Sequence, residues 1–132
     1  MIPDKESMAM SRILVVDDDR HIRNMLLRIF EGQGYDVSLA ENGKHGLEVL
    51  AEQDVDLIVS DILMPEKDGL EMISTVKELY PDIKIVAMSG GGHIGSENYL
   101  RLAQHMGAER TIQKVIMCED IIRVANELLR EF

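Results

Sequence analysis

The sequence feature that most constrains the fold is an alternation of short apolar runs with amphipathic stretches. Five apolar runs alternate with five segments in which apolar side chains recur at spacings of three and four residues. The expected strands are Ile13–Val16, Tyr35–Ala40, Val55–Asp61, Ile83–Met88 and Arg110–Gln113. Strands that are apolar on both faces and separated by helices predict a mainly parallel sheet that is covered on both sides.

The number of units favours an open sheet over a closed barrel. Five strand–helix units fall short of the roughly eight that a barrel requires, and right-handed crossovers restrict the remaining topologies. We therefore predict an α/β doubly wound sandwich with five parallel strands and five helices, formed by residues 11–132. Residues 1–10, with the polar stretch Pro3–Ser7, are expected to be a flexible N-terminal lead.

Local signals predict where individual helices begin and which side chains they bury. Asn42 is expected to cap the second helix. In the third helix, four apolar residues share one face and predict burial against the sheet: Leu70, Ile73, Val76 and Leu79.

Charge and composition exclude several classes of function. The 132 residues carry a net charge of −10, which argues against nucleic acid or an anionic membrane as the main partner. A single cysteine, Cys118, permits no intramolecular disulfide and fits a reducing cytoplasm. No apolar run approaches the roughly 18 residues that a membrane span needs.

Polar and charged side chains stand at the ends of the predicted strands. Asp17, Asp18 and Asp19 end the first strand, and Asp61 ends the third. Ser89 follows the fourth strand and supplies a hydroxyl, and Lys114 follows the fifth strand and supplies an ammonium. Because ligands of open parallel sheets bind beyond the carboxyl ends of the strands, we expect these groups to converge on one edge.

Each of these residues also has a simpler interpretation. Asp19 or Asp18 could cap the following helix, Ser89 could be a loop hydroxyl, and Lys114 could be a solvated surface lysine. The combination is more informative, because crowded carboxylates repel one another unless a cation binds. Hard oxygen ligands at an open site suit Mg²⁺, and a lysine beside them suits a phosphoryl group. The set predicts Mg²⁺-assisted phosphoryl transfer.

Several segments closely resemble receiver domains of two-component response regulators. They are the run Ile13–Asp19, the stretch Asp61–Gly69 with its Asp-x-x-Met-Pro-x-x-Asp-Gly pattern, Ser89–Gly90, and Gly107–Ala108 leading to Lys114. The resemblance covers residues 12–132 and implies a flavodoxin-like sheet with strand order 2-1-3-4-5. It also implies a cytoplasmic signalling domain that is not an enzyme but catalyses its own phosphorylation and dephosphorylation.

The resemblance implies a role for each matching residue. Asp61 is the phosphoacceptor, and it ligates Mg²⁺ together with Asp18 and the backbone carbonyl of Leu63. Asp17 assists the ion directly or through water. The donor is a histidine kinase, a histidine phosphotransfer protein or a small acyl phosphate, and water later hydrolyses the aspartyl phosphate.

Two further residues act on the phosphoryl group in the resembled family. Lys114 pairs with its oxygens, and Ser89 swings in to bond it, which switches contacts with a downstream protein that the sequence does not identify. A homodimer through the fourth and fifth units is possible.

Two departures from the family pattern matter. Receivers usually carry proline after the lysine, with a cis peptide between them, whereas this chain has Lys114-Val115. Because a cis bond before a non-proline residue costs about 2.5–4 kcal/mol, we expect a trans bond, a rearranged loop or a less firmly placed lysine. Thr111 stands where many receivers have a switching aromatic residue, so the switch is expected to use the glycine-rich loop 90–95 instead.

Other motifs carry weaker hypotheses. Gly90, Gly92 and Gly95 spell G-x-G-x-x-G, but no acidic residue follows about 20 positions on at a strand end, so nucleotide binding is not expected. No two of the four histidines have ligand spacing on one helix, which argues against a zinc site.

Three functions compete at this point. The first is a stand-alone response regulator or phosphorelay intermediate, which is also compatible with a fragment of a longer regulator. The second is a receiver-like interaction domain that no longer switches. The third is a phosphohydrolase with Asp17 or Asp19 as nucleophile, which leaves the Asp61 motif unexplained.

Overall fold

The computed structural model describes residues 11–62, 69–90 and 96–130. Residues 1–10, for which a flexible lead was predicted, lie outside this part of the chain. The strands are β1 (Arg12–Val16), β2 (Asp36–Ala40), β3 (Leu57–Asp61), β4 (Lys84–Gly90) and β5 (Arg110–Lys114). The helices are α2 (Arg20–Gly32), α3 (Gly43–Glu52), α4 (Gly69–Leu79), α5 (Ser96–Met106) and α6 (Cys118–Leu129).

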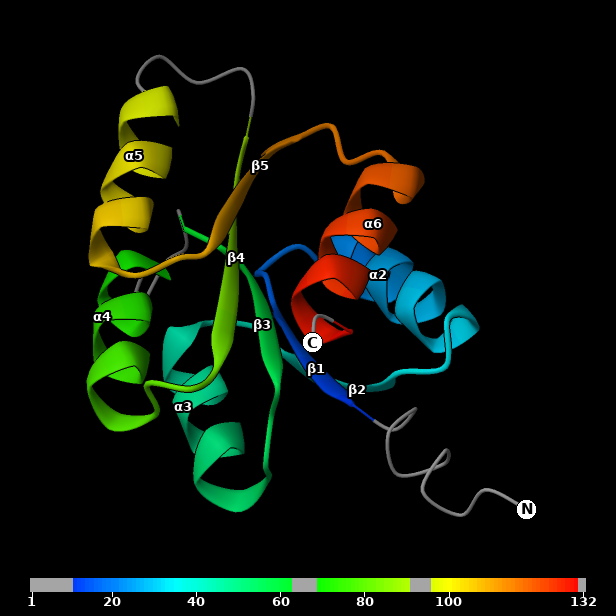
Figure 1. Ribbon diagram of the computed structural model, residues 1–132, viewed down its shortest axis with the longest axis horizontal. Coiled ribbons are helices and arrows are strands. Elements are labelled where there is room, and N and C mark those ends of the chain that lie inside the picture. The colour runs from blue at the N-terminus through cyan, green and yellow to red at the C-terminus, as the bar shows by residue number, and fades with distance from the viewer. Residues whose placement is uncertain (1–10, 63–68, 91–95, 131–132) are drawn as a thin grey trace.

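The strands form one parallel sheet in the order β2-β1-β3-β4-β5. Helices α3, α4 and α5 cover one face, and α2 and α6 cover the other (Figure 1). The doubly wound α/β fold with strand order 2-1-3-4-5 and five helices is therefore confirmed. None of the helices in the described ranges has the length and apolar character of a membrane span.

Each face of the sheet has its own core, because successive side chains of a strand point to opposite faces. In β1, Leu14 and Val16 pack into the core beneath α3, α4 and α5, whereas Ile13 and Val15 pack into the core beneath α2 and α6. The central strands are therefore buried on both faces, as their continuous apolar runs predicted.

Two helices begin at side-chain caps. Asn42 Oδ1 accepts a hydrogen bond of 2.8 Å from the backbone N–H of His45, which confirms the predicted cap of α3. Asp19 Oδ1 accepts one of 2.8 Å from the N–H of His21 at the start of α2. Of the two interpretations of Asp19, helix capping is the one that the structure supports.

Two strands end later than expected, and the burial of one residue differs from expectation. Ser89 lies inside β4 and Lys114 is the last residue of β5, because strand pairing continues to the Gly90–Lys114 register. Leu79 was predicted to share the buried face of its helix, but it is 60% exposed. It is the last residue of α4, three positions beyond Val76, the last residue of the helix that is buried in the core.

Gly69 brings the start of α4 directly against the end of β3. Its N–H donates a 3.2 Å hydrogen bond to the carbonyl of Ile62. A Cβ atom at this position would clash with the carbonyl oxygen of Asp61 and lie 2.5 Å from the Cα of Ile62. Both neighbours are backbone atoms, so neither can rotate away as a side chain could.

We expect Gly69→Ala to destabilise the protein by about 2 kcal/mol or more, because overpacking against backbone requires α4 or β3 to move. Gly32→Ala is the matched control, since nothing lies within 4 Å of a Cβ at that helical position. The control should change stability by less than about 1 kcal/mol. Urea unfolding of the two variants measures the difference, and equal stabilities would contradict the close approach.

Candidate functional site

Three carboxylates gather at the carboxyl edge of the sheet. One oxygen each from Asp17, Asp18 and Asp61 lies within 4.8 Å of the others. Asp17 directly follows β1 and Asp61 ends β3, and these strands are neighbours with Val16 opposite Ser60. The backbone N–H of Asp17 also donates to the carbonyl of Ala40 at 3.1 Å. Strand pairing therefore brings together acids that are more than 40 positions apart in the sequence.

The three acids differ in exposure and in hydrogen bonding. Asp17 is fully buried, Asp61 is nearly so, and Asp18 is exposed. The Oδ1 atom of Asp17 accepts a 2.8 Å hydrogen bond from the backbone N–H of Asp19. Arg23 donates to the backbone carbonyl of Asp17 at 2.9 Å. Asp17 is thus held in place, while Asp18 faces solvent at the mouth of the cluster.

Lys114 reaches the cluster from the end of β5, the edge strand of the sheet. Its Nζ donates to Asp17 Oδ2 at 2.8 Å and to Asp61 Oδ2 at 3.3 Å. The lysine side chain is 19% exposed, so the ion pair is largely shielded from water. One ammonium therefore bridges the acid that follows β1 and the acid that ends β3, although β4 separates β5 from β3.

Both partners of the ion pair have a raised pKa, for different reasons. Burial raises the pKa of Asp17 and outweighs the lowering effects of the hydrogen bonds from Lys114 and Asp19. Burial lowers the pKa of Lys114, but its hydrogen bond and charge interactions with Asp17 and Asp61 more than compensate, so its pKa is raised overall. The desolvation cost falls mainly on Asp17, because its carboxylate is fully buried and the ammonium is not.

Two buried serines near Asp61 have contrasting hydrogen bonds. Ser60 donates from Oγ to the carbonyl of Asp61 at 2.8 Å. Ser89 is fully buried, and its Oγ has no hydrogen-bond partner among the described residues. A buried hydroxyl normally has a partner. Within the described part of the chain, the donor of Ser89, in the strand next to β3, is an exception.

The expectation for the bond after Lys114 was wrong. The Lys114-Val115 peptide is cis, and Lys114 is firmly placed by its two carboxylate partners. The prediction considered only the local preference of the peptide bond. It took no account of the tertiary contacts on both sides, where Lys114 bonds the acids and Ile116 packs into the core beneath α2 and α6.

The structure describes only some of the remaining predicted residues. Leu63, whose carbonyl the resemblance implies as a ligand, lies outside the described residues, as do Gly92 and Gly95 of the glycine motif. Thr111 is half-buried in β5 opposite Ala87. Cys118 is an exposed free thiol at the start of α6.

The donor set fits a hard divalent cation. All three groups are carboxylates, which Mg²⁺ prefers, and the exposed Asp18 leaves one side open for water or phosphate ligands. This is the one such cluster within residues 11–62, 69–90 and 96–130. Asp19, the third acid of the sequence run, is not part of it.

Three supporting residues were missed from the sequence. Ser60, Arg23 and Gly69 each contact the backbone of Asp17, Asp61 or Ile62. Only Gly69 carried a signal, as a glycine in the loop pattern, and nothing in the sequence showed that it touches the end of β3. Unlike helix caps, these contacts follow no local sequence pattern, which is why their roles were not predicted.

Comparison with known proteins gives a consistent family. The model of the response regulator receiver domain matches residues 13–126. Response regulator MprA of Mycolicibacterium vanbaalenii is 34% identical over 119 residues, which are 90% of this chain and 50% of that protein. Response regulator receiver protein CpdR of Brucella abortus is 40% identical over 81 residues, 61% of this chain and 68% of that protein.

A solved structure shares the fold closely. The CheY-like receiver domain protein from Methanospirillum hungatei has a TM-score of 0.84 and 30% identity, covering 92% of this chain and 95% of that chain. The chain spans about half the length of the MprA relatives that it matches.

The two serines generate one prediction. Ser89→Ala should leave the stability of the protein unchanged or slightly higher, because the hydroxyl it removes has no partner in the described part of the chain. Ser60→Ala, the matched control, should cost about 1 kcal/mol, because it removes a buried hydrogen bond to Asp61. Thermal or urea unfolding without divalent cations measures both. An equal loss in the two variants would show that the hydroxyl of Ser89 is bonded.

The raised pKa of Asp17 leads to a second prediction. The folded protein holds the Asp17 proton more tightly than the unfolded chain, so this group stabilises folding below pH 3.8, and that contribution is lost as the pH rises through the raised pKa. In EDTA at neutral pH, Asp17→Asn should therefore be more stable than wild type, with an advantage that shrinks as the pH falls. Lys114 keeps its contact with Asp61 in this variant.

Urea unfolding across pH measures this advantage. Asp120→Asn removes an exposed carboxylate on α6 and controls for the loss of one negative charge. If Asp17→Asn were less stable than wild type at neutral pH, the ion pair with Lys114 would outweigh the cost of burial.

Proposed function

Because residues 13–126 match the response regulator receiver domain, this chain belongs to that family, and we propose that Asp61 is its phosphoacceptor. A receiver is a signalling domain of two-component systems rather than a metabolic enzyme. The observation that carries the proposal is the contact between Lys114 and Asp61 inside a cluster of three carboxylates.

The geometry favours Asp61 over the other two acids. Asp17 is fully buried and both of its carboxylate oxygens accept hydrogen bonds, from Asp19 and from Lys114. Asp18 is exposed, and it is Asp17 and Asp61 that the ammonium contacts. Of the three acids, only Asp61 is both partly accessible, with a side chain that is 9% exposed, and in contact with the ammonium of Lys114, at 3.3 Å.

The proposed reaction is a phosphoryl transfer to a carboxylate. An oxygen of Asp61 forms a bond to phosphorus as the bond from phosphorus to a histidine nitrogen or an acyl oxygen breaks. Lys114 neutralises charge on the oxygens of the transferred group, and Asp18, Asp61 and Asp17 would hold Mg²⁺. When bound, the ion supplies further charge neutralisation between the carboxylates and the incoming group. The carbonyl of Leu63, as the resemblance implies, is proposed as a further ligand.

Ser89 is proposed as the residue that senses the phosphoryl group. Its buried hydroxyl, which has no partner within residues 11–62, 69–90 and 96–130, lies in β4, one residue beyond Met88, the register partner of Asp61. A new acceptor at Asp61 would give this donor a partner, which biases the position of the end of β4. Thr111 occupies the β5 position of the usual aromatic residue, so β4 and the segment after it are expected to carry the change.

The partners follow from the family. A histidine kinase or a histidine phosphotransfer protein is the proposed donor, and the proposed downstream partner is another protein. Whether the domain forms a homodimer, and its cytoplasmic location, remain predictions. The output activity of a longer regulator is likewise a proposal, because the matched MprA proteins are about twice as long as the match.

The two competing functions have less support. A phosphohydrolase with Asp17 or Asp19 as nucleophile is disfavoured. Asp17 is fully buried and both of its carboxylate oxygens accept hydrogen bonds, and the carboxylate of Asp19 caps α2 instead of joining the cluster. A domain that no longer switches was suggested by Thr111 and Val115, but Lys114 occupies the site despite the missing proline.

Intact-mass analysis after treatment with acetyl phosphate tests the proposal. We expect one phosphoryl group on wild type in Mg²⁺, none in EDTA, and a loss of at least about tenfold in Asp61→Asn. Asp54→Asn, which changes an exposed acid at the other end of the sheet, is the matched control and should label like wild type. Labelling of Asp61→Asn at the wild-type level would refute the assignment.

A further inference from the structure

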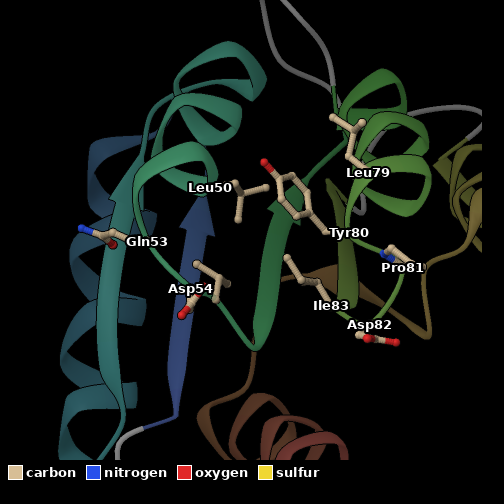
Figure 2. A pocket seen from close by; sticks show the side chains of 9 residues that line it. Leu50, Gln53, Asp54, Leu79, Tyr80, Pro81, Asp82 and Ile83 are labelled. Carbon is tan, nitrogen blue, oxygen red and sulfur yellow. The ribbon is translucent and has the colours of Figure 1, made fainter.

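A groove lies at the end of the sheet opposite the acidic site. It has a volume of about 300 Å³ and lies between the ends of α3 and α4, where β3 and β4 begin. Its lining consists of Leu50, Gln53, Asp54, Val55, Leu79, Tyr80, Pro81, Asp82 and Ile83. Figure 2 shows the side chains of Leu50 and Tyr80 pointing toward one another across the gap between the two helices.

The floor of the groove is apolar and its outer wall exposes an apolar side chain. Leu50, Val55 and Ile83 are each more than nine-tenths buried and line its base. Leu79 lines the same groove and is 60% exposed, although its helix periodicity predicted burial. An apolar side chain of a ligand would contact both this floor and the exposed leucine, and this contact removes apolar surface from water.

The rim is strongly acidic. Asp54 and Asp82 lie on the two sides of the gap (Figure 2). Within residues 50–56 and 78–84, exposed acids outnumber exposed bases by five to one: Glu52, Asp54, Asp56, Glu78 and Asp82 against Lys84. Lys77, the nearest other lysine in sequence, does not neutralise this rim, because its ammonium bonds Glu109 and the carbonyl of Ile83.

The walls are fixed by hydrogen bonds rather than formed by loose loops. The N–H of Tyr80 donates to Val76 at 2.6 Å, and the N–H of Ile83 donates to Tyr80 at 3.1 Å. Lys77 Nζ donates to the carbonyl of Ile83 at 2.8 Å, which ties the turn to α4. A ligand would therefore meet a preorganised groove and lose little binding free energy to ordering it.

From these features we propose that the groove binds a peptide in which an apolar side chain is flanked by lysine or arginine. The volume is at the small end for a ligand pocket, so it suits one or two side chains rather than a cofactor. The acidic rim complements a basic peptide and repels a second copy of this acidic chain. No other acid joins Asp54 or Asp82 in a metal-binding cluster among the described residues.

The probe is a peptide with one leucine between two pairs of lysines, added to the full chain labelled with ¹⁵N. We expect backbone amide shifts that concentrate at residues 50–55 and 79–83. Leu79→Ser and Asp82→Asn should each weaken binding by at least about threefold. Leu102→Ser on α5 and Glu31→Gln on α2 are matched controls at exposed positions and should bind like wild type.

Two altered peptides separate specific docking from charge attraction. Replacing the leucine of the peptide by serine, or its lysines by glutamates, should each reduce the shifts at least about threefold. The proposal is overturned if the serine peptide binds equally well, if the shifts centre on Asp17 and Asp61, or if none occur at millimolar peptide. Concentration-dependent shifts at residues 79–83 without peptide would assign the groove to self-association instead. Acetyl phosphate labelling of Leu79→Ser checks independently that the acidic site is intact.

Discussion

The placement of one ammonium among three carboxylates is the interaction on which the site depends. Two like charges 4 Å apart repel by about 4 kcal/mol at the effective dielectric constant of a protein surface, so the acids could not gather without a cation. Lys114 bonds Asp17 and Asp61 and offsets much of this repulsion. It cannot neutralise three carboxylates, however. The remaining negative charge favours the binding of a divalent cation at this edge of the sheet.

The topology of the sheet makes this placement possible. Because β1 and β3 are neighbours, the acids that follow them lie on one edge without any loop having to bring them together. β5 lies two strands from β3, a gap that only a long side chain such as lysine can cross. β4 lies between them and carries Ser89 next to the same site. β1 and β3 therefore supply carboxylates, β4 a hydroxyl and β5 an ammonium.

Much of this could be predicted from the sequence, and the exceptions share a physical cause. Periodicity and strand-end residues predicted the sheet, the cap at Asn42 and the convergence of Asp17, Asp18 and Asp61, because these depend on local pattern and on parallel pairing. The cis bond after Lys114 and the exposure of Leu79 were not predicted, because tertiary contacts and the edge of the core decide them. Residue 63 lies outside the described part of the chain, so its role rests on the resemblance.

Helix α4 contacts both ends of the sheet, and this gives the two ends a direct mechanical connection. Its first residue, Gly69, meets the backbone of Asp61 with no side chain between them, and its last, Leu79, forms part of the groove. Between these two residues, α4 is anchored in the core by three fully buried side chains, Met72, Ile73 and Val76. A closely packed helix moves largely as a rigid body, because its buried side chains have no empty space to absorb a displacement. Any displacement of the Asp61 backbone is therefore resisted along the whole of α4, as far as the residues that line the groove.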